Sequence, residues 1–312
     1  SIMKLNKKKV ASIGTLGVKS KNINLNLFNT TIDPIKLGQI LQKLKKKKIE
    51  NVIMEASSHG LKQNRLDGLN FKSGIFTNLS QDHLDYHKNL KNYLKAKLYL
   101  FENLIEKKGN IITDKDIPQF EIIKKISLKK KLNLSAINEK QNNFKILSHS
   151  YDNENQLIKI KHKNLIKKID LNLIGKIQIK NILMAAIAAQ KSNLKFENIL
   201  KVLPKLKPVA GRLEKIGKIK NNSVVILDYA HTPDALKVCL LNIKEQFPDK
   251  KLNLLFGCGG NRDQNKRMKM GKIASIYADN IYLTDDNPRL ENPEKIRKDI
   301  KRGIKDRKLQ NF

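Results

Sequence analysis

The chain has 312 residues and a formal net charge of +34, with 63 Lys and Arg against 29 Asp and Glu. Apolar segments recur along it and hydrophobic residues make up 40%, which excludes a disordered polycation and predicts roughly two domains of ordinary size. No apolar run reaches the roughly 18 residues of a membrane span, and the lysine-rich start lacks the apolar core of a signal peptide. Cys239 and Cys258 are too few for a disulfide framework, so a reducing cytoplasm fits best.

The positive charge is almost entirely lysine. There are 55 Lys and 8 Arg, the lysines are spread along the whole chain, and aromatic residues make up only 5%. Arginine supplies the bidentate contacts to bases and phosphates, so few such contacts are available. We therefore expect no specific nucleic-acid partner and interpret the lysines as a solvated surface, although non-specific polyanion binding at low salt is expected.

Apolar runs of strand length alternate with helical patterns, which is typical of an α/β fold. The first strong helix signal is Asp33 as N-cap with Pro34 after it, which predicts a helix over 34–47. The elements expected next are strands over 51–55 and 73–77, a helix over about 90–105, a strand over 109–113, an antiparallel meander over 143–174 and an alanine-rich helix over 179–190.

Two prolines and a glycine between Pro204 and Gly211 interrupt this pattern and predict a domain boundary. The expected domains are residues 1–208 and 209–312. After the boundary we expect strands over 223–227, 252–256 and 280–283, alternating with helices over 233–246, 269–277 and 293–304. Three such βα units predict one parallel sheet with helices on its faces.

Polar clusters follow several expected strands, where ligands bind in open α/β sheets. Glu55 ends one strand, and a carboxylate there either holds Mg²⁺ or caps the following loop. His83 and His87 have the spacing of two zinc ligands on a helix, but no third and fourth ligand is evident, and polar helix caps are the alternative. Lys97, taken alone, is one more lysine on a solvated helix face.

In the second half, Asp228, Tyr229 and His231 follow a strand. The aspartate suits ribose hydroxyls and the two rings suit a base or phosphate; the alternative is a plain turn with Thr232 capping the next helix. The segment FGCGGNRD resembles a phosphate loop, but Arg262 stands where a dinucleotide fingerprint needs glycine.

A last cluster, TDDNPR, also follows a strand. Arg289 in it could grip a carboxylate through two parallel hydrogen bonds, and Asp286 lies three residues before it. Together they could present opposite charges to a zwitterionic ligand. The alternative is a turn with a surface ion pair.

The order of these segments is specific. The chain contains, in turn, MEASSHGLKQNRLDGLNFKSGIFTNLSQDHLDYH, YLKAKLYLF, PVAGRLEKI, LDYAHTPDAL, FGCGGNRD and TDDNPR, and over nearly its whole length it resembles the Mur ligases. The resemblance implies a central ATPase-type domain with a mostly parallel sheet and a small antiparallel meander, followed by a partial Rossmann-like domain. It also implies a cytoplasmic, monomeric ligase of cell-wall synthesis with no membrane partner.

The resemblance assigns roles residue by residue. The implied ligands of Mg²⁺ are Glu55, His83 and Lys97, the last after reaction with CO₂ to a carbamate. The implied contacts to the UDP-muramoyl-dipeptide are Thr30, Thr31, Ser57, Gln63 and Arg65. The implied ATP-facing residues are Asn181, Arg212, Asp228, Tyr229 and His231. The implied pocket for the incoming amino acid is formed by Arg262, Asp286, Asn287 and Arg289.

The implied reaction is ATP-dependent. A D-glutamyl carboxylate of UDP-N-acetylmuramoyl-L-alanyl-D-glutamate is phosphorylated by ATP, and an amine then attacks the acyl phosphate. Arg289 suits the extra carboxylate of meso-2,6-diaminopimelate, which lysine lacks. The alternatives are an L-lysine-adding, other Mur-type or folyl-type ligase, and a non-catalytic polyanion-binding paralogue; SSHGLKQNR and DNPR argue against the folyl type.

The chain departs from the family at the phosphate loop. It contains no G-x-x-x-x-G-K-[ST] sequence, and IGTLG at 13–17 matches the segment that follows this loop in the family. We therefore expect an internal fragment that does not catalyse ligation alone.

Overall fold

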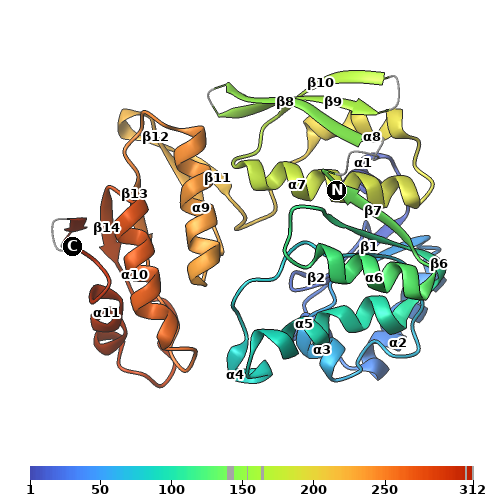
Figure 1. Ribbon diagram of the computed structural model, residues 1–312, viewed down its shortest axis with the longest axis horizontal. Coiled ribbons are helices and arrows are strands. Elements are labelled where there is room, and N and C mark those ends of the chain that lie inside the picture. The colour runs from blue at the N-terminus through green and yellow to red at the C-terminus, as the bar shows by residue number, and fades with distance from the viewer. Residues whose placement is uncertain (139–143, 153, 163–164, 306–307, 311–312) are drawn as a thin grey trace.

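The computed structural model describes residues 1–138, 144–152, 154–162, 165–305 and 308–310. Figure 1 shows two bodies of helices and strands, which meet near the ends of helices α7 and α9. We refer to them as the first body, up to residue 205, and the second body, from residue 211. In the described part of the chain, no helix has the length and apolar character needed to cross a membrane.

The first sheet has the strand order β3-β2-β1-β4. Its strands are β1 (Val10–Gly14), β2 (Gly17–Lys19), β3 (Asn24–Leu25) and β4 (Asn51–Met54). The same stretch of chain contains the helices α1 (Ile2–Leu5), α2 (Pro34–Lys46) and α3 (Ser58–Lys62). β1 runs parallel to β4 and antiparallel to β2. The helix predicted over 34–47 is confirmed, because Asp33 accepts a hydrogen bond from the Lys36 N–H at 2.8 Å. Leu37, Ile40 and Leu44 form its buried face.

The second sheet is entirely parallel, in the order β5-β6-β7. Its elements are β5 (Phe71–Ile75), α4 (Leu84–His87), α5 (Leu90–Tyr99), the π-helical turn Leu100–Leu104, β6 (Ile105–Asp114), α6 (Phe120–Lys130) and β7 (Asn133–Ile137). The helix predicted over 90–105 is therefore present, but its last turn is π-helical.

The predicted antiparallel meander is confirmed. It consists of β8 (Phe144–Asp152), β9 (Asn155–His162) and β10 (Leu165–Leu171), and it is followed by α7 (Lys176–Lys191), α8 (Phe196–Val202) and the 3₁₀ turn Leu203–Lys205. Ile158 and Ile160 alternate with less buried residues along β9 and enter the same core as Ile179 and Leu183 of α7. Within 143–174, residues 143, 153 and 163–164 lie outside the described residues.

The second body corrects one prediction. Its elements are β11 (Glu214–Ile219), the turn Lys220–Asn222, β12 (Ser223–Leu227), α9 (Pro233–Gln246), β13 (Asn253–Phe256), α10 (Asn265–Tyr277), β14 (Asn280–Leu283), α11 (Pro293–Lys301) and β15 (Leu309–Gln310). The strand over 223–227 was expected in one parallel sheet with 252–256 and 280–283, and this is wrong. β12 pairs antiparallel with β11, while the parallel sheet is β13-β14-β15. Asn221 and Asn222 both have positive φ, which turns the chain back on itself as a tight hairpin requires.

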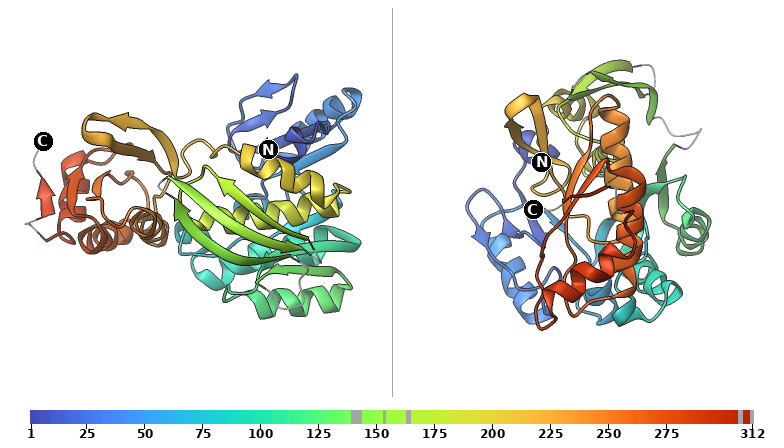
Figure 2. Two further views of the ribbon diagram at one scale, coloured as in Figure 1. Left: turned by 90° about the horizontal axis from the view of Figure 1, so that it is seen from above. Right: turned by 90° about the vertical axis from the view of Figure 1, so that its left-hand side faces the viewer.

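The two bodies touch at the carboxyl end of α9. Gln246, only 3% exposed, accepts a hydrogen bond from the Gly175 N–H at 2.9 Å and donates one to the Glu154 carbonyl at 2.9 Å. One turn earlier, Asn242 accepts from the Ile177 N–H at 3.0 Å. The second body (orange and red in Figure 2) therefore lies beside the meander and the start of α7.

Candidate active site

Glu55 follows directly after β4, at the carboxyl end of the strand, as the sequence predicts. Its backbone N–H donates to the Ile13 carbonyl at 2.8 Å, which continues the pairing with β1. Its carboxylate Oε2 accepts from the Thr15 N–H at 2.9 Å and from the Thr15 hydroxyl at 2.8 Å. The Thr15 hydroxyl also lies 2.9 Å from that of Thr30, so Thr30 and the Glu55 carboxylate share one small polar network.

The residues implied for the UDP-muramoyl-dipeptide surround the same strand end. Thr31 is 3% exposed; its hydroxyl donates to the Glu55 carbonyl at 3.0 Å and accepts from the Ser57 N–H at 2.9 Å. Arg65 donates to the Thr31 carbonyl at 2.6 Å. Because its hydroxyl already donates to one backbone group and accepts from another, the buried Thr31 side chain shapes the loop.

The side chain of Gln63 reaches the short helix α4, which follows the first strand of the second sheet. Its amide donates to the Tyr86 hydroxyl at 2.9 Å, and Tyr86 packs on the His59 ring with 4.1 Å between centroids. Ser57 caps α3 by accepting from the Gly60 N–H at 3.1 Å. The strand end that carries Glu55 is thereby joined to the segment that carries His83.

Three imidazoles gather in this region. The His59 ring lies 4.9 Å from that of His83 and 5.4 Å from that of His87, which stacks on Tyr93 at 5.0 Å. His87 is only 4% exposed, its Nε2 lies 2.9 Å from the Ser58 hydroxyl, and burial lowers its pKa. Among the described residues, no three His, Cys, Asp or Glu side chains form a group that could hold a metal ion. His87 is accordingly a packed residue, and the zinc interpretation gains no support.

His83 is positioned by the residue before it. Asp82 accepts from the His83 N–H at 2.8 Å, and its Oδ2 lies 3.4 Å from His83 Nε2. The same Oδ2 lies 3.5 Å from Nε2 of His231, in the second body. Burial raises the pKa of Asp82, but the hydrogen bond to His231 and the charges of both histidines outweigh burial and lower it. Sequence analysis did not select Asp82; its only signal is its place beside His83.

Lys97 lies in the last turn of α5, near Asp82 and His83. Its Nζ donates to the Asn78 carbonyl at 3.0 Å and lies 5.4 and 5.3 Å from the ring centroids of Phe76 and Tyr93. Burial lowers the pKa of Lys97, against the opposing charge of Asp82. The Tyr93 ring is also 6.0 Å from that of His83. His83 and Lys97 are thus brought together around Tyr93, whereas the described hydrogen bonds of the Glu55 carboxylate go to Thr15.

The implied ATP-facing residues meet where the two bodies join. Asp228 accepts from the Leu213 N–H at 2.8 Å and the Ala230 N–H at 2.9 Å, one on each carboxylate oxygen. The Arg212 guanidinium lies 4.6 Å from the ring centroid of Tyr229. The Arg212 carbonyl accepts from the Gln178 amide at 3.0 Å, and the Gln178 oxygen lies 3.5 Å from the Asn181 amide nitrogen. Asn181, Arg212 and Tyr229 are therefore linked through Gln178, and the His231 ring packs on Tyr229 at 5.0 Å.

The glycine-rich segment and the DNPR segment pack against each other. Arg289 donates to the Gly260 carbonyl at 2.6 Å, and the Gly260 N–H donates to the Asn287 carbonyl at 2.8 Å. A Cβ at Gly260 would lie 1.9 Å from the Pro288 carbonyl oxygen, and one at Gly259 would lie 2.8 Å from Arg289 Nη1. This close approach explains the paired glycines without any bound phosphate.

The remaining members of the implied amino-acid pocket lie beside this contact or on its rim. Asp286 Oδ2 would be 3.6 Å from a Cβ at Gly259, and Arg262 is exposed. The surface ion pair considered for this turn involves the neighbouring residue instead, since Asp285 pairs with Arg297. Cys258 is 4% exposed with its thiol 3.7 Å from Met270 Sδ, so it is a packed residue.

Arg267 is a functional candidate that sequence reasoning missed. It is fully buried on α10, and its guanidinium contacts Glu291 at 2.8 and 3.0 Å and Asp299 at 3.1 Å. Glu291 also accepts from the Asn261 N–H. Through Glu291, Arg267 therefore stabilises the contact between the glycine-rich segment and the end of the DNPR segment. Among so many basic residues, nothing in the sequence distinguished it.

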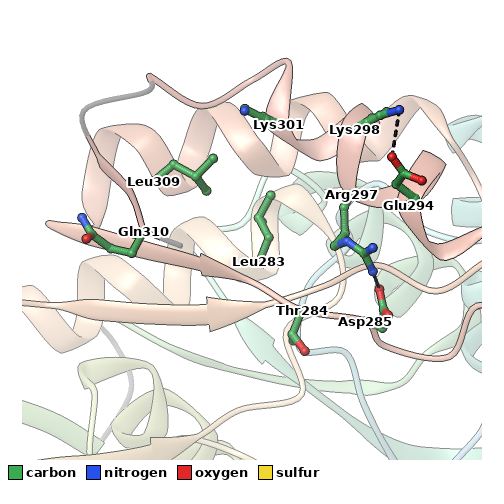
Figure 3. A pocket seen from close by; sticks show the side chains of 9 residues that line it. All are labelled: Leu283, Thr284, Asp285, Glu294, Arg297, Lys298, Lys301, Leu309 and Gln310. Atoms are coloured by element: carbon green, nitrogen blue, oxygen red, sulfur yellow. Dashed lines mark hydrogen bonds and ion pairs between the residues drawn. The ribbon is translucent and has the colours of Figure 1, made fainter. Parts of the chain in front are cut away.

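A cavity of about 640 Å³ lies between β14, α11 and β15. Asp285, the neighbour of Asp286 in the sequence, is one of the residues that line it. Figure 3 shows two of its cations engaged by acids, Arg297 with Asp285 and Lys298 with Glu294. Lys301 also lines the cavity, so its charged side chains are three cations and two acids.

Comparison with known proteins defines the class. The model of the Mur ligase middle domain matches residues 1–189, and that of the Mur ligase glutamate ligase domain matches residues 211–311. The chain belongs to the Mur ligase family.

Among its relatives, the chain is 39% identical over 304 residues to the UDP-N-acetylmuramoyl-L-alanyl-D-glutamate--2,6-diaminopimelate ligase of Rickettsia typhi, covering 96% of this chain and 61% of that protein. It is 39% identical over 292 residues to the ligase of the same name from Zymomonas mobilis, covering 94% of this chain and 60% of that protein. The chain thus spans about 61% of the length of such relatives.

Solved structures agree on the fold. One of a UDP-N-acetylmuramoyl-L-alanyl-D-glutamate--2,6-diaminopimelate ligase aligns with a TM-score of 0.70 at 30% identity, covering 99% of this chain and 63% of its own. A folylpolyglutamate synthase of Mycobacterium tuberculosis aligns with a TM-score of 0.75 at 12% identity, covering 99% and 76%. At that identity the second likeness shows the fold alone.

Proposed function

We propose that the chain is part of a ligase that uses ATP to add meso-2,6-diaminopimelate to UDP-N-acetylmuramoyl-L-alanyl-D-glutamate in peptidoglycan synthesis. The observation that carries the proposal is the convergence of two groups far apart in sequence. Asp82, beside His83 and near Lys97, pairs with His231 of the implied ATP-facing turn. The names of relatives that match 94–96% of the chain support the same reaction.

The chemical problem is that a carboxylate is a poor electrophile, because attack adds charge to an anion. ATP transfers its γ-phosphoryl group to the D-glutamyl carboxylate and leaves as ADP; the amine attacks the carbonyl carbon of the acyl phosphate, loses a proton, and phosphate leaves. The chain's part is to orient the reactants and to balance charge as the phosphoryl group moves. Arg212, stacked on Tyr229, and His231 are the basic side chains proposed to face the nucleotide.

We propose that Glu55, His83 and a carbamate on Lys97 hold Mg²⁺. The donor chemistry fits, because a carboxylate and a carbamate offer the oxygen ligands that this ion prefers. The Lys97 environment fits too: burial lowers its pKa, which favours the neutral amine that reacts with CO₂. Mg²⁺ would supply charge neutralisation at the phosphoryl oxygens.

The acceptor pocket is proposed to consist of Arg262, Asp286, Asn287 and Arg289. Arg289 is held by its contact with the Gly260 carbonyl, which fixes the guanidinium before a ligand arrives. A positioned guanidinium favours a ligand with a second carboxylate. This supports diaminopimelate over lysine as the amine.

We also propose a domain boundary, an oligomeric state and a cellular compartment. We place the domain boundary between residues 208 and 209, which is supported by family models that match on either side of 190–210. The protein is proposed to act in the cytoplasm as a monomer.

The test is calorimetric titration of the purified chain with meso-diaminopimelate and with L-lysine. Diaminopimelate should bind more tightly, because lysine leaves the Arg289 guanidinium without its carboxylate. Equal affinity for both amino acids would reject the assigned amine, and failure of both to bind would reject the pocket.

A further inference from the structure

One carboxylate connects the two bodies beside the candidate active site. Asp82 is half-buried; it holds His83 through the backbone N–H at 2.8 Å and lies 3.5 Å from His231 Nε2. A single side chain thus touches a residue implied to hold Mg²⁺ and a residue implied to face ATP.

His231 is also fixed from its own side. Its Nδ1–H donates to the Tyr229 carbonyl at 3.0 Å, and its carbonyl accepts from Lys266 Nζ at 2.7 Å. Since the Tyr229 carbonyl holds Nδ1 within the same turn, the imidazole is oriented within the second body, with Nε2 left to face Asp82. Asp82 therefore meets a positioned partner, which lowers the entropy lost in forming the pair.

The position of this contact matters because of helix α9. His231 lies just before the helix, and Gln246 ends it against Gly175 and Glu154. The helix has 14 residues, so at 1.5 Å per residue the two contacts lie roughly 20 Å apart along a rigid rod. Contacts at both ends prevent rotation that either one alone would permit.

We propose that Asp82 is a positioning residue that closes the second body over the first by pairing with His231 while it holds His83. The catalytic meaning of this closure rests on the proposed function, but the closure itself is a property of the chain. Without Asp82, the second body remains attached at the Gln246 end and pivots there.

The test measures a distance across the two bodies by electron–electron double resonance. Spin labels are placed at Leu128→Cys on α6 and Ile276→Cys on α10, which are 71% and 65% exposed. The native Cys239 and Cys258 are buried and remain unlabelled. We expect one narrow distribution in the labelled parent chain. Asp82→Asn and Asp82→Ala should each broaden it and move it to longer distance.

A reciprocal exchange, Asp82→His with His231→Asp, should restore the narrow distribution, which a merely local structural role of either residue would not do. The matched control is Asp85→Ala, which removes an exposed carboxylate from the same segment and should leave the distribution narrow. Circular dichroism checks that each variant is folded.

An unchanged distribution in folded Asp82→Asn would overturn the proposal. If the parent chain shows the narrow distance distribution but does not bind diaminopimelate, the proposed function is refuted and the inference about Asp82 is not.

Discussion

Arg267 is fully buried, and its guanidinium is shared between Glu291, at 2.8 and 3.0 Å, and Asp299, at 3.1 Å. Both carboxylates are themselves largely covered, with side chains 15% and 17% exposed. The pairing joins α10, the end of the DNPR segment and α11. The implied amino-acid pocket is therefore supported by an ion-pair cluster that is largely shielded from solvent.

Replacing Arg267 with Met should destabilise the protein. Removing one partner of a buried ion pair typically costs about 3–5 kcal/mol, and slight hydration of the two carboxylates places the expected loss near the lower end. Urea unfolding followed by circular dichroism measures it. The control is Arg302→Met. The Arg302 side chain is 72% exposed and pairs with the same Asp299, so its removal should lower the free energy of unfolding by about 1 kcal/mol or less. Similar losses in both variants would mean that burial does not decide the effect.

Lys97 should form a carbamate with dissolved CO₂. Burial lowers its pKa, so more of the amine is neutral than in a solvated lysine. Carbon-13 NMR with labelled bicarbonate should show a carbamate signal that disappears in Lys97→Arg. The exposed Lys95 two residues away supplies the control, since Lys95→Arg should keep the signal. A signal that survives Lys97→Arg would place the modification elsewhere.

Arg289→Ala should weaken the binding of diaminopimelate by about tenfold to a hundredfold, because a hydrogen bond to a charged group contributes about 1.5–3 kcal/mol. Calorimetry measures the change, and nucleotide affinity should be much less affected. Arg297→Ala is the matched control: it removes an arginine of the same domain that pairs with Asp285. If both variants bind diaminopimelate alike, the assignment of Arg289 is refuted.

Gly260→Ala should be destabilising, because its Cβ would lie 1.9 Å from the backbone oxygen of Pro288 and the two segments would have to separate. Overpacking of this kind costs about 1–3 kcal/mol. Gly38→Ala provides the opposite case, since no atom lies within 4 Å of its Cβ and the residue is only half-buried within α2. That change should stabilise the protein by about 0.5–1 kcal/mol. Thermal unfolding of both variants decides whether close packing explains the glycine pair.

Glu154 should make stability depend on pH. Hydrogen bonds from Lys215 and Lys218 lower its pKa, so its folded value lies below its unfolded value near 4.3. Its contribution is therefore present above the unfolded pKa and is lost as the pH falls through the folded value. Glu154→Gln should cost about 1 kcal/mol or less at pH 7 and almost nothing at pH 3, measured by urea unfolding. Glu197→Gln, an exposed glutamate on α8, should show no such dependence.

Local signals predicted most of the elements. Asp33 with Pro34 and Thr232 with Pro233 mark helices that begin at those residues in the structure. The strand over 223–227 was also placed correctly, but its partner was not. Alternation of apolar residues reports which side of a strand is buried, and it carries no information on whether the neighbouring strand runs parallel or antiparallel.

Some residues of the candidate site could be found from the sequence, and others only from the structure. Local motifs selected His83 and Arg289, whereas Lys97 was selected only through the resemblance to the Mur ligases. Asp82 and Arg267 were missed because their importance lies in partners that are remote in the chain, His231 for one and Glu291 and Asp299 for the other.

By itself, the sequence determined the α/β class, the strand ends where polar residues accumulate, and the family, because these depend on short-range periodicity and motif order. Only the tertiary structure decided that β12 turns back on β11, that Arg267 supports the DNPR segment, and that Asp82 reaches His231. The reason is physical: charges and backbone groups select partners by distance and burial in the folded chain, and neither quantity can be read from neighbouring residues.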